Sequence, residues 1–204
     1  MHVLFLPQAG NQPWWEIVVN GEVWRVVHRS IFGKKPRFPA INSEEDLQSE
    51  FDRYEYLRVK GYVLWRLSKQ HYHSEQLLKL LRDRKVQDLS AFRVIEECCD
   101  LGLLDDQAWI DSFLRSQGKK YGLSFILKKL YAKGVSSKTI NAIAASWDNH
   151  EDEIESIQKL IKKRAASKNI QEPKERQKMI ASLMRKGYSY EQVRKALESF
   201  EDSN

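Results

Sequence analysis

The chain has 204 residues, of which 42% are hydrophobic and 30% charged, a composition that excludes a disordered chain and fits one or two domains or a short array of repeats. Residues 1–114 hold 15 basic and 17 acidic side chains, whereas residues 115–204 hold 19 and 11, so the net charge of +6 is carried by the second half. The two cysteines, Cys98 and Cys99, exclude a disulfide framework, and no apolar run approaches the roughly 18 residues of a membrane span, so we expect a cytoplasmic protein, acting as a monomer.

The first 42 residues predict a small β-hairpin extension. The segment WWEIVVNGEVWRVVHR places two runs of β-branched and aromatic residues around Asn20-Gly21, a dipeptide that tolerates the positive φ angles of a type I′ turn. The segment GKKPRFP, from Gly33 to Pro39, is rich in turn-forming residues and predicts a loop. Three tryptophans of the hairpin are expected to cover one face of the sheet: Trp14, Trp15 and Trp24.

From residue 43 onward the sequence predicts helices. Ser43, followed three residues later by Asp46, marks the start of the first helix. Apolar residues in the segment 123–131 recur at i, i+3, i+4, i+7 and i+8, which is one face of a helix. Gly134 falls where the C-cap of that helix belongs, and Ser136 is the predicted N-cap of the next one. Short helices of this kind are stable only when each buries one face against its neighbours.

An internal repeat organises the helical part. The anchors Leu81, Leu130 and Leu183 are 49 and 53 residues apart, and apolar residues follow each anchor at five, ten and fourteen positions. A period of about 50 residues accommodates three short helices, and stacked units of this kind form a long array. We therefore predict a mainly α protein of tandem three-helix repeats in an elongated, curved array, divided at residues 1–42 (hairpin extension), 43–102, 103–149 and 150–204 (repeats).

Patterns that carry catalytic or metal chemistry are weak in this sequence. His71 and His73 would point apart on a helix and lack further ligands nearby, so they are predicted to be surface or turn residues. Asp105 and Asp106 are adjacent carboxylates, but Asp105 precedes an apolar-periodic run and is predicted to be a helix N-cap. The segment GKKYG lacks the Ser or Thr and the preceding strand of a phosphate loop. We therefore expect a protein that is not an enzyme and that has no metal and no cofactor.

The aromatic residues of the second half have two possible roles, in the core or in base stacking. Trp109, Phe113 and Trp147 lie on apolar stripes and are predicted to belong to the core. Tyr121 follows two lysines in a loop, so it either contacts a partner or packs over the next helix.

Basic residues are the better candidates for function. From Ser112 to Trp147 there are seven Lys and Arg and no Asp or Glu, whereas solvated helix faces usually mix the two signs. Unmixed positive charge attracts anionic surfaces, although a merely solvated face is the open alternative. The predicted contact residues are a central group, Arg115, Lys119, Lys120, Tyr121, Lys128, Lys129 and Lys133, and a flanking group, Lys162, Lys163, Arg164, Arg185 and Lys186.

The repeats resemble those of a known family, the RecX family of bacterial regulators. Its central repeat is similar to LGLLDDQAWIDSFLRSQGKKYGLSFILKKLYAKGVS, its C-terminal repeat to MIASLMRKGYSYEQVRKALESF, and its first repeat to RVKGYVLWRLSKQHYHSEQLLKLLRDRKV. The resemblance implies a regulator that binds the RecA recombinase and its filaments on single-stranded DNA. It further implies inhibition of strand exchange, of ATP hydrolysis and of the co-protease activity that drives the SOS response to DNA damage, and so a role in DNA repair and recombination.

Other functions remain open on the residues alone. Short trihelical units are also typical of helix-turn-helix modules that bind DNA directly through a basic face. A helical scaffold for acidic proteins would share the same charge, whereas a hydrolase or nuclease has no motif in its favour.

Overall fold

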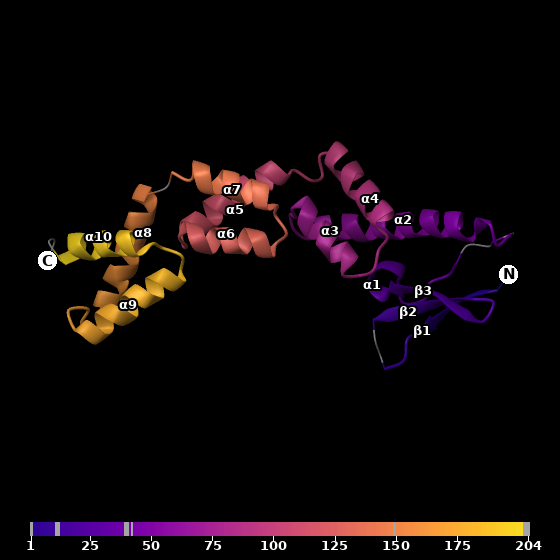
Figure 1. Cartoon of the computed structure of the whole chain (residues 1–204), viewed down its shortest axis with the longest axis horizontal. Helices are drawn as coiled ribbons and strands as arrows, with labels where there is room; N and C mark the ends of the chain where they lie inside the picture. Colours follow the sequence, from indigo (N-terminus) through magenta and orange to yellow (C-terminus); the bar gives the residue numbers. More distant parts are fainter. Residues whose placement is uncertain (1, 11–12, 39–40, 42, 149, 202–204) are drawn as a thin grey trace. The chain divides into compact units, whose positions relative to one another are not determined.

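The computed structural model of the chain describes residues 2–10, 13–38, 41, 43–148 and 150–201 and confirms a mainly helical protein with a small antiparallel sheet near its N-terminus (Figure 1). The chain divides into two compact units, Met1–Asp106 and Gln107–Asn204. The predicted domain boundary at residue 102 stays a prediction. The predicted domain boundaries at residues 42 and 149 fall outside the described residues. Pro39 of the predicted loop also falls outside them.

The sheet of the first unit has the strand order β1-β2-β3, with β1 (Val3–Pro7), β2 (Trp14–Val19) and β3 (Glu22–His28) all antiparallel. The predicted hairpin is β2 and β3, and its turn has φ of 51° at Asn20 and 95° at Gly21, as a type I′ turn requires. The strand β1 was not predicted as a separate element. Its pattern was weak because Val3 and Phe5 pack inward while Leu4 and Leu6 are exposed, so polar residues do not mark the outer face.

The helices of the first unit pack on the sheet and on one another. They are α1 (Arg29–Phe32), α2 (Asp46–Leu67), α3 (Ser74–Arg82) and α4 (Asp88–Asp100). Rings join both the sheet and α1 to α2. Trp24 of β3 meets Phe51 edge-on with centroids 5.3 Å apart, and Phe32 of α1 stacks on Phe51 with centroids 6.1 Å apart. The start of α2 is fixed by Ser43, whose Oγ accepts a hydrogen bond from the Asp46 amide at 3.3 Å. One apolar core therefore serves the sheet and the first helices together.

The second unit consists of helices with two apolar clusters. One cluster lies among α5 (Asp106–Gly118, which begins at the last residue of the first unit), α6 (Leu123–Ala132) and α7 (Ser137–Ser146). The other lies among α8 (His150–Ala165), α9 (Pro173–Arg185) and α10 (Tyr190–Glu201). Ile126 and Leu130 of the predicted stripe are fully buried in the first cluster, and Trp109, Phe113 and Trp147 pack against it.

The three leucine anchors correspond to one helix end that is built three times. The amide five residues after each anchor donates to the anchor's carbonyl, at 3.2 Å for Leu81, 3.2 Å for Leu130 and 3.4 Å for Leu183. The residue before each donor has positive φ, 57° at Lys85, 90° at Gly134 and 93° at Gly187. This is the left-handed helix ending in which glycine is favoured, and it explains the repeated spacing as a repeated turn.

No helix in the described ranges is both long enough and apolar enough to cross a membrane.

Candidate functional site

The twelve predicted contact residues all lie in the second unit, at helix ends and on helix faces. Arg115 lies in the last turn of α5, and Lys119, Lys120 and Tyr121 form the turn that leads into α6. The others lie on or at the end of α6 (Lys128, Lys129, Lys133), on α8 (Lys162, Lys163, Arg164) and at the end of α9 (Arg185, Lys186).

Tyr121 lies between aromatic and cationic neighbours. Its ring stacks on Phe125 with centroids 4.3 Å apart and an interplanar angle of 18°. The Nζ of Lys129 lies 4.8 Å from both ring centroids, and the Nζ of Lys186 lies 5.2 Å from that of Tyr121. The ring therefore packs over the next helix, one of the two predicted roles, and its contact with a partner stays a prediction.

Three of the predicted lysines have partners within the protein, Lys186 through the ring of Tyr121 and two others through rings and an amide. Besides its ring contacts, Lys129 donates from Nζ to Oε1 of Gln117 at 3.2 Å. Lys133 Nζ lies 5.7 Å from the ring centroid of Trp109 and 5.9 Å from that of Phe113, two rings that stack on each other at 5.2 Å. Contacts of this kind hold a cation near the surface at a gain of about 0.5–1 kcal/mol each.

Arg164 is paired within the second unit. Its Nη2 lies 3.1 Å from Oε2 of Glu175, whose other oxygen accepts from Lys178 Nζ at 2.6 Å. These two hydrogen bonds lower the pKa of Glu175 below its ordinary value. Arg164 therefore joins α8 to α9 and is the least available of the flanking group.

The remaining cations of the predicted set are exposed. Within the described ranges no carboxylate lies at ion-pair distance from Arg115, Lys119, Lys120, Lys128, Lys162, Lys163 or Arg185. A positive charge without a protein partner is available to an anionic ligand, so these residues carry the candidate site.

A polar junction holds the turn before α6 against the turn after α9. Gly122 donates its amide to the carbonyl of Lys186 at 2.9 Å, and Ser124 Oγ donates to the carbonyl of Gly187 at 3.1 Å. The side chain of Glu153, on α8, accepts from the Leu123 amide at 3.0 Å and so satisfies an N–H group at the first turn of α6. The junction brings Lys119 and Lys120 near Lys186, although more than sixty residues separate them in sequence.

Glu153 is a residue that sequence analysis missed. It is 2% exposed and also accepts a hydrogen bond from Nε2 of Gln192 on α10. The sequence spacing could have identified it, because Glu153, Ile157 and Ile161 follow one another at i, i+4 and i+8 and so share one face of α8. Both isoleucines on that face are fully buried. A carboxylate on a buried stripe needs hydrogen-bond donors from other elements, which here come from α6 and α10.

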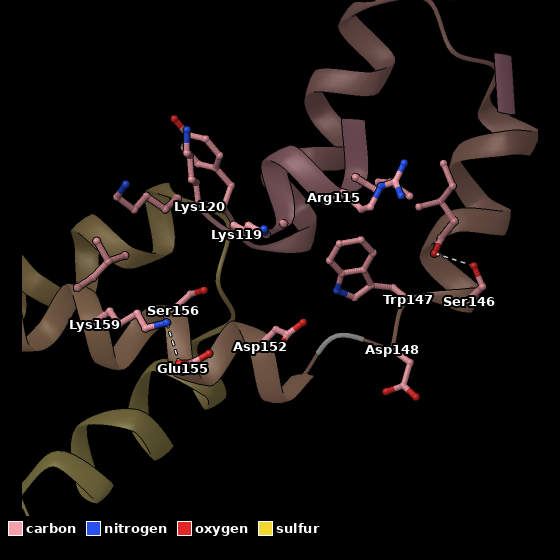
Figure 2. A pocket seen from close by; sticks show the side chains of 16 residues that line it. Arg115, Lys119, Lys120, Ser146, Trp147, Asp148, Asp152, Glu155, Ser156 and Lys159 are labelled. Atoms are coloured by element: carbon pink, nitrogen blue, oxygen red, sulfur yellow. Dashed lines mark hydrogen bonds and ion pairs between the residues drawn. The ribbon is translucent and has the colours of Figure 1, made fainter. Parts of the chain in front are cut away.

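A pocket of about 820 Å³ opens beside this junction (Figure 2). Its walls include five of the predicted residues: Arg115, Lys119, Lys120, Tyr121 and Lys186. Trp147, at the end of α7, contributes its half-buried indole, and Asp148, Asp152 and Glu155 contribute carboxylates. The pocket therefore combines unpaired cations, an aromatic face and acidic groups within one unit.

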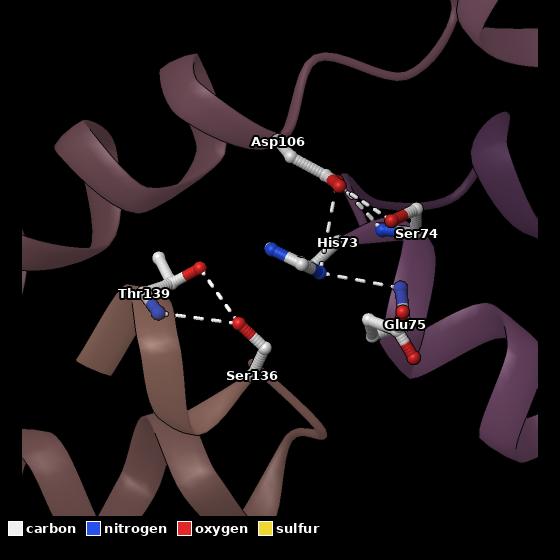
Figure 3. A network of polar contacts seen from close by, with 6 residues as sticks. All are labelled: His73, Ser74, Glu75, Asp106, Ser136 and Thr139. Carbon is white, nitrogen blue, oxygen red and sulfur yellow. Dashed lines mark hydrogen bonds and ion pairs between the residues drawn. The ribbon is translucent and has the colours of Figure 1, made fainter. Parts of the chain in front are cut away.

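His71 and His73 were predicted to be surface or turn residues. Both lie in the segment that connects α2 to α3, but the surface alternative is wrong for His73, which is buried. His71 is exposed, whereas His73 is 5% exposed and is the N-cap of α3, its Nδ1 accepting from the Glu75 amide at 3.2 Å (Figure 3). Burial lowers the pKa of His73 below its ordinary value, although the carboxylates of Asp106 and Glu75 act in the opposite direction. A neutral ring is the form that can accept the capping hydrogen bond.

Asp106 forms hydrogen bonds with Ser74, a residue far from it in the sequence. Its Oδ1 accepts from the Ser74 amide at 2.7 Å, and its Oδ2 accepts from the hydroxyl of Ser74 (Figure 3). It therefore stabilises the start of α3 from the first residue of α5, while Asp105 directly precedes that helix, in the predicted N-cap position. No cluster of three or more metal-ligating side chains occurs among the residues that the structure describes.

Comparison with known proteins links this chain to one group of regulators. The family model described as the third three-helix domain of RecX matches residues 151–197. The regulatory protein RecX of Streptomyces coelicolor is 28% identical over 131 residues, which are 60% of this chain and 69% of that protein. The regulatory protein RecX of Mycobacterium leprae is 30% identical over 118 residues, which are 56% of this chain and 68% of that protein.

Solved structures show the same fold. A crystal structure of regulatory protein RecX superposes with a TM-score of 0.61 at 18% identity, covering 96% of this chain and 98% of that one. The crystal structure of RecX from Lactobacillus salivarius gives a TM-score of 0.55 at 20% identity, covering 72% of this chain and 96% of that one.

Proposed function

The chain belongs to the RecX family of regulatory proteins, and from this premise we propose that it binds the RecA recombinase and its filaments on single-stranded DNA. Binding restrains the filament, so that ATP hydrolysis, strand exchange and co-protease activity fall. The protein thereby acts as a non-enzymatic modulator in DNA repair and in control of the SOS response.

One observation carries this proposal, the unpaired positive surface of the second unit. Seven cations there lack a carboxylate partner within the described ranges, and no acidic residue interrupts the sequence from Ser112 to Trp147. A nucleoprotein filament offers two anionic targets, the phosphates of its strand and acidic patches of its protein. Neutralising phosphates releases condensed counterions, which gives a basic surface affinity without sequence preference.

The contacts within the protein rank the basic residues. Lys119 and Lys120 are exposed, lie on a turn fixed by the junction and have no internal partner in the described part of the chain, so they are the best placed to reach a partner. Lys129 and Lys133 are half-buried against rings and support the surface more than they extend from it. Arg164 is committed to Glu175.

The DNA-dependent ATPase of RecA tests the proposal. Wild-type protein is expected to inhibit hydrolysis in a concentration-dependent manner. The double variant Lys119→Glu with Lys120→Glu reverses two charges at the exposed turn and should weaken inhibition by at least about tenfold in the concentration required, since two attractive contacts at ~0.7 kcal/mol or more each become repulsive.

The matched control makes the same charge change in the first unit. Lys69→Glu with Lys79→Glu alters two exposed lysines outside the basic surface and should leave inhibition unchanged. A wild-type protein that does not inhibit RecA at several-fold molar excess contradicts the proposed function. Equal loss of inhibition in both double variants would show that net charge alone, and not this surface, is responsible.

A further inference from the structure

We propose that the pocket of the second unit holds one unstacked nucleotide of a single strand, with the base against the indole of Trp147 and the phosphate toward Lys119 and Lys120. This assignment rests on the proposed function and names the part of the nucleoprotein partner that the unit contacts. It also gives Trp147, which packs against the α5–α7 core, a second role.

The size and the charge of the pocket suit a nucleotide. Its volume of about 820 Å³ falls in the range of sites that enclose small molecules. In the view of Figure 2, Lys119 and Lys120 lie along one side, and Asp152 lies on the other side with the indole of Trp147 nearby. Carboxylates repel a phosphate but accept N–H groups from a base edge. The two walls therefore orient a nucleotide with its phosphate toward the lysines and its base toward Asp152.

Trp147 is the aromatic residue best placed to stack on a base. Among the described residues no acceptor lies within hydrogen-bond distance of its Nε1, so the ring is positioned by packing alone. Trp15 differs, because its Nε1 donates to the carbonyl of Gly33 at 3.0 Å. The ring of Tyr121 lies in the same pocket, but it is already stacked on Phe125 and has two lysine ammonium groups beside it. An indole that is not hydrogen-bonded can adjust to a base without losing a hydrogen bond.

Neighbouring charges leave the lysines free for phosphate. Glu155, the third acidic group of the pocket, is paired with Lys159, the two charged atoms being 2.7 Å apart. Lys119, Lys120 and Arg115 have no such partner in the described ranges. Among the described residues, no carboxylate compensates the positive side of the pocket, while one carboxylate on the negative side is already neutralised.

Binding of two labelled strands tests the assignment in the absence of RecA. One strand is a short thymidylate oligomer, and the other is an abasic oligomer with the same number of phosphates. Wild-type protein should bind the thymidylate oligomer more tightly, because only that strand offers bases to stack. Trp147→Leu should reduce affinity for the thymidylate oligomer by roughly 5- to 150-fold, the range that corresponds to stacking of one base, and leave the abasic strand unchanged.

Two further variants separate stacking from damage to the fold. Trp147→Phe keeps an aromatic ring and should retain most of the preference for the thymidylate strand. Trp65→Leu removes an exposed tryptophan of the first unit and should change neither affinity. The proposal is wrong if Trp147→Leu loses the same factor of affinity for both strands. It is also wrong if the wild-type protein binds both strands with equal affinity.

Free thymidine monophosphate is the last probe. If it competes as effectively as the oligomer, the pocket is a site for free nucleotides and the assignment to a strand is wrong. Weak competition by the free nucleotide supports the assignment. Because these measurements contain no RecA, they can fail while inhibition of the RecA ATPase is observed, and the reverse also holds.

Discussion

At the scale of single residues, two histidines of the first unit act as helix caps through Nδ1. His73 caps α3, and His28 caps α1 by accepting from the Ser30 amide at 3.1 Å. Histidine is a less usual N-cap than serine or aspartate, and it functions only while Nδ1 is unprotonated. The pKa of each is lowered chiefly by burial, which keeps the ring in the accepting form.

Protonation of His73 should weaken the folded protein. Because its pKa is lower in the folded protein than the ordinary value of 6.5, its stabilising contribution is present above pH 6.5 and is lost as the pH falls through the folded pKa. Its contribution cannot exceed about 1.4 kcal/mol of unfolding free energy per pH unit. His73→Asn retains a capping acceptor that does not titrate, so the variant should lose less stability than wild type between pH 6.5 and pH 5.

Chemical denaturation at a series of pH values measures this difference. His28 titrates in both proteins and cancels from the comparison. His71→Asn, which replaces an exposed histidine two residues away, is the control and should show the wild-type decline. Parallel pH profiles for wild type and His73→Asn would contradict the assigned role of His73.

At the scale of elements, the junction of the second unit depends on a close approach of two glycines. A Cβ placed on Gly122 would lie 2.5 Å from the carbonyl carbon of Gly187 and 2.6 Å from the amide nitrogen of Tyr188. Both neighbours are backbone atoms, so the contact cannot be relieved by a side-chain rotation. The start of α6 can therefore approach the turn after α9 only if Gly122 has no side chain.

Gly122→Ala should destabilise the second unit by roughly 1–3 kcal/mol, the usual cost of overpacking. Gly61→Ala is the control, and we expect it to stabilise the protein. Gly61 lies exposed within α2, a Cβ there meets no atom within 4 Å, and replacing a helical glycine by alanine stabilises by about 0.5–1 kcal/mol. Thermal unfolding of both variants checks the two signs, and an unchanged or raised midpoint in Gly122→Ala would show that the contact is not maintained.

The elements also show what the sequence could and could not predict. The hairpin turn, the buried face of α6 and the Ser136 cap, whose Oγ accepts from the Thr139 amide at 3.2 Å, depend on neighbours within a few residues, and each was predicted. The contact between Gly122 and Gly187 and the capping of α6 by Glu153 join segments 30 or more residues apart, and local periodicity carries no information about such pairs. The same limit applies to the candidate site, where the basic run was visible but its grouping with Trp147 and Asp152 around one pocket was not.

At the scale of the whole molecule, charge is divided between the two compact units. Residues 107–204 hold 19 basic and 12 acidic side chains, whereas residues 1–106 hold 15 and 16. The first unit also contains the sheet, and its core is larger and more aromatic than either apolar cluster of the second unit. In this core Phe32 and Phe38 each stack on Phe51. Under the proposed function, this division assigns the contact with the anionic partner to the second unit.

The salt dependence of binding to single-stranded DNA distinguishes phosphate contacts from contacts with protein. For single strands the slope of log K against log salt is about −0.7 for each phosphate neutralised, so replacing Lys119 and Lys120 by glutamine should make the slope shallower by about 1.4 if both contact phosphates. The control, Lys69→Gln with Lys79→Gln, should leave the slope unchanged.

The measurement is made with the strand alone and again with a RecA filament. A change in slope with the strand alone shows that the two lysines contact phosphates directly, as the pocket assignment requires, because the strand is then the only macromolecular anion present. If the slope changes only with the filament, the two lysines contact anionic groups that RecA supplies or exposes. If the slope is the same as wild type with both the strand and the filament, neither lysine belongs to the interface.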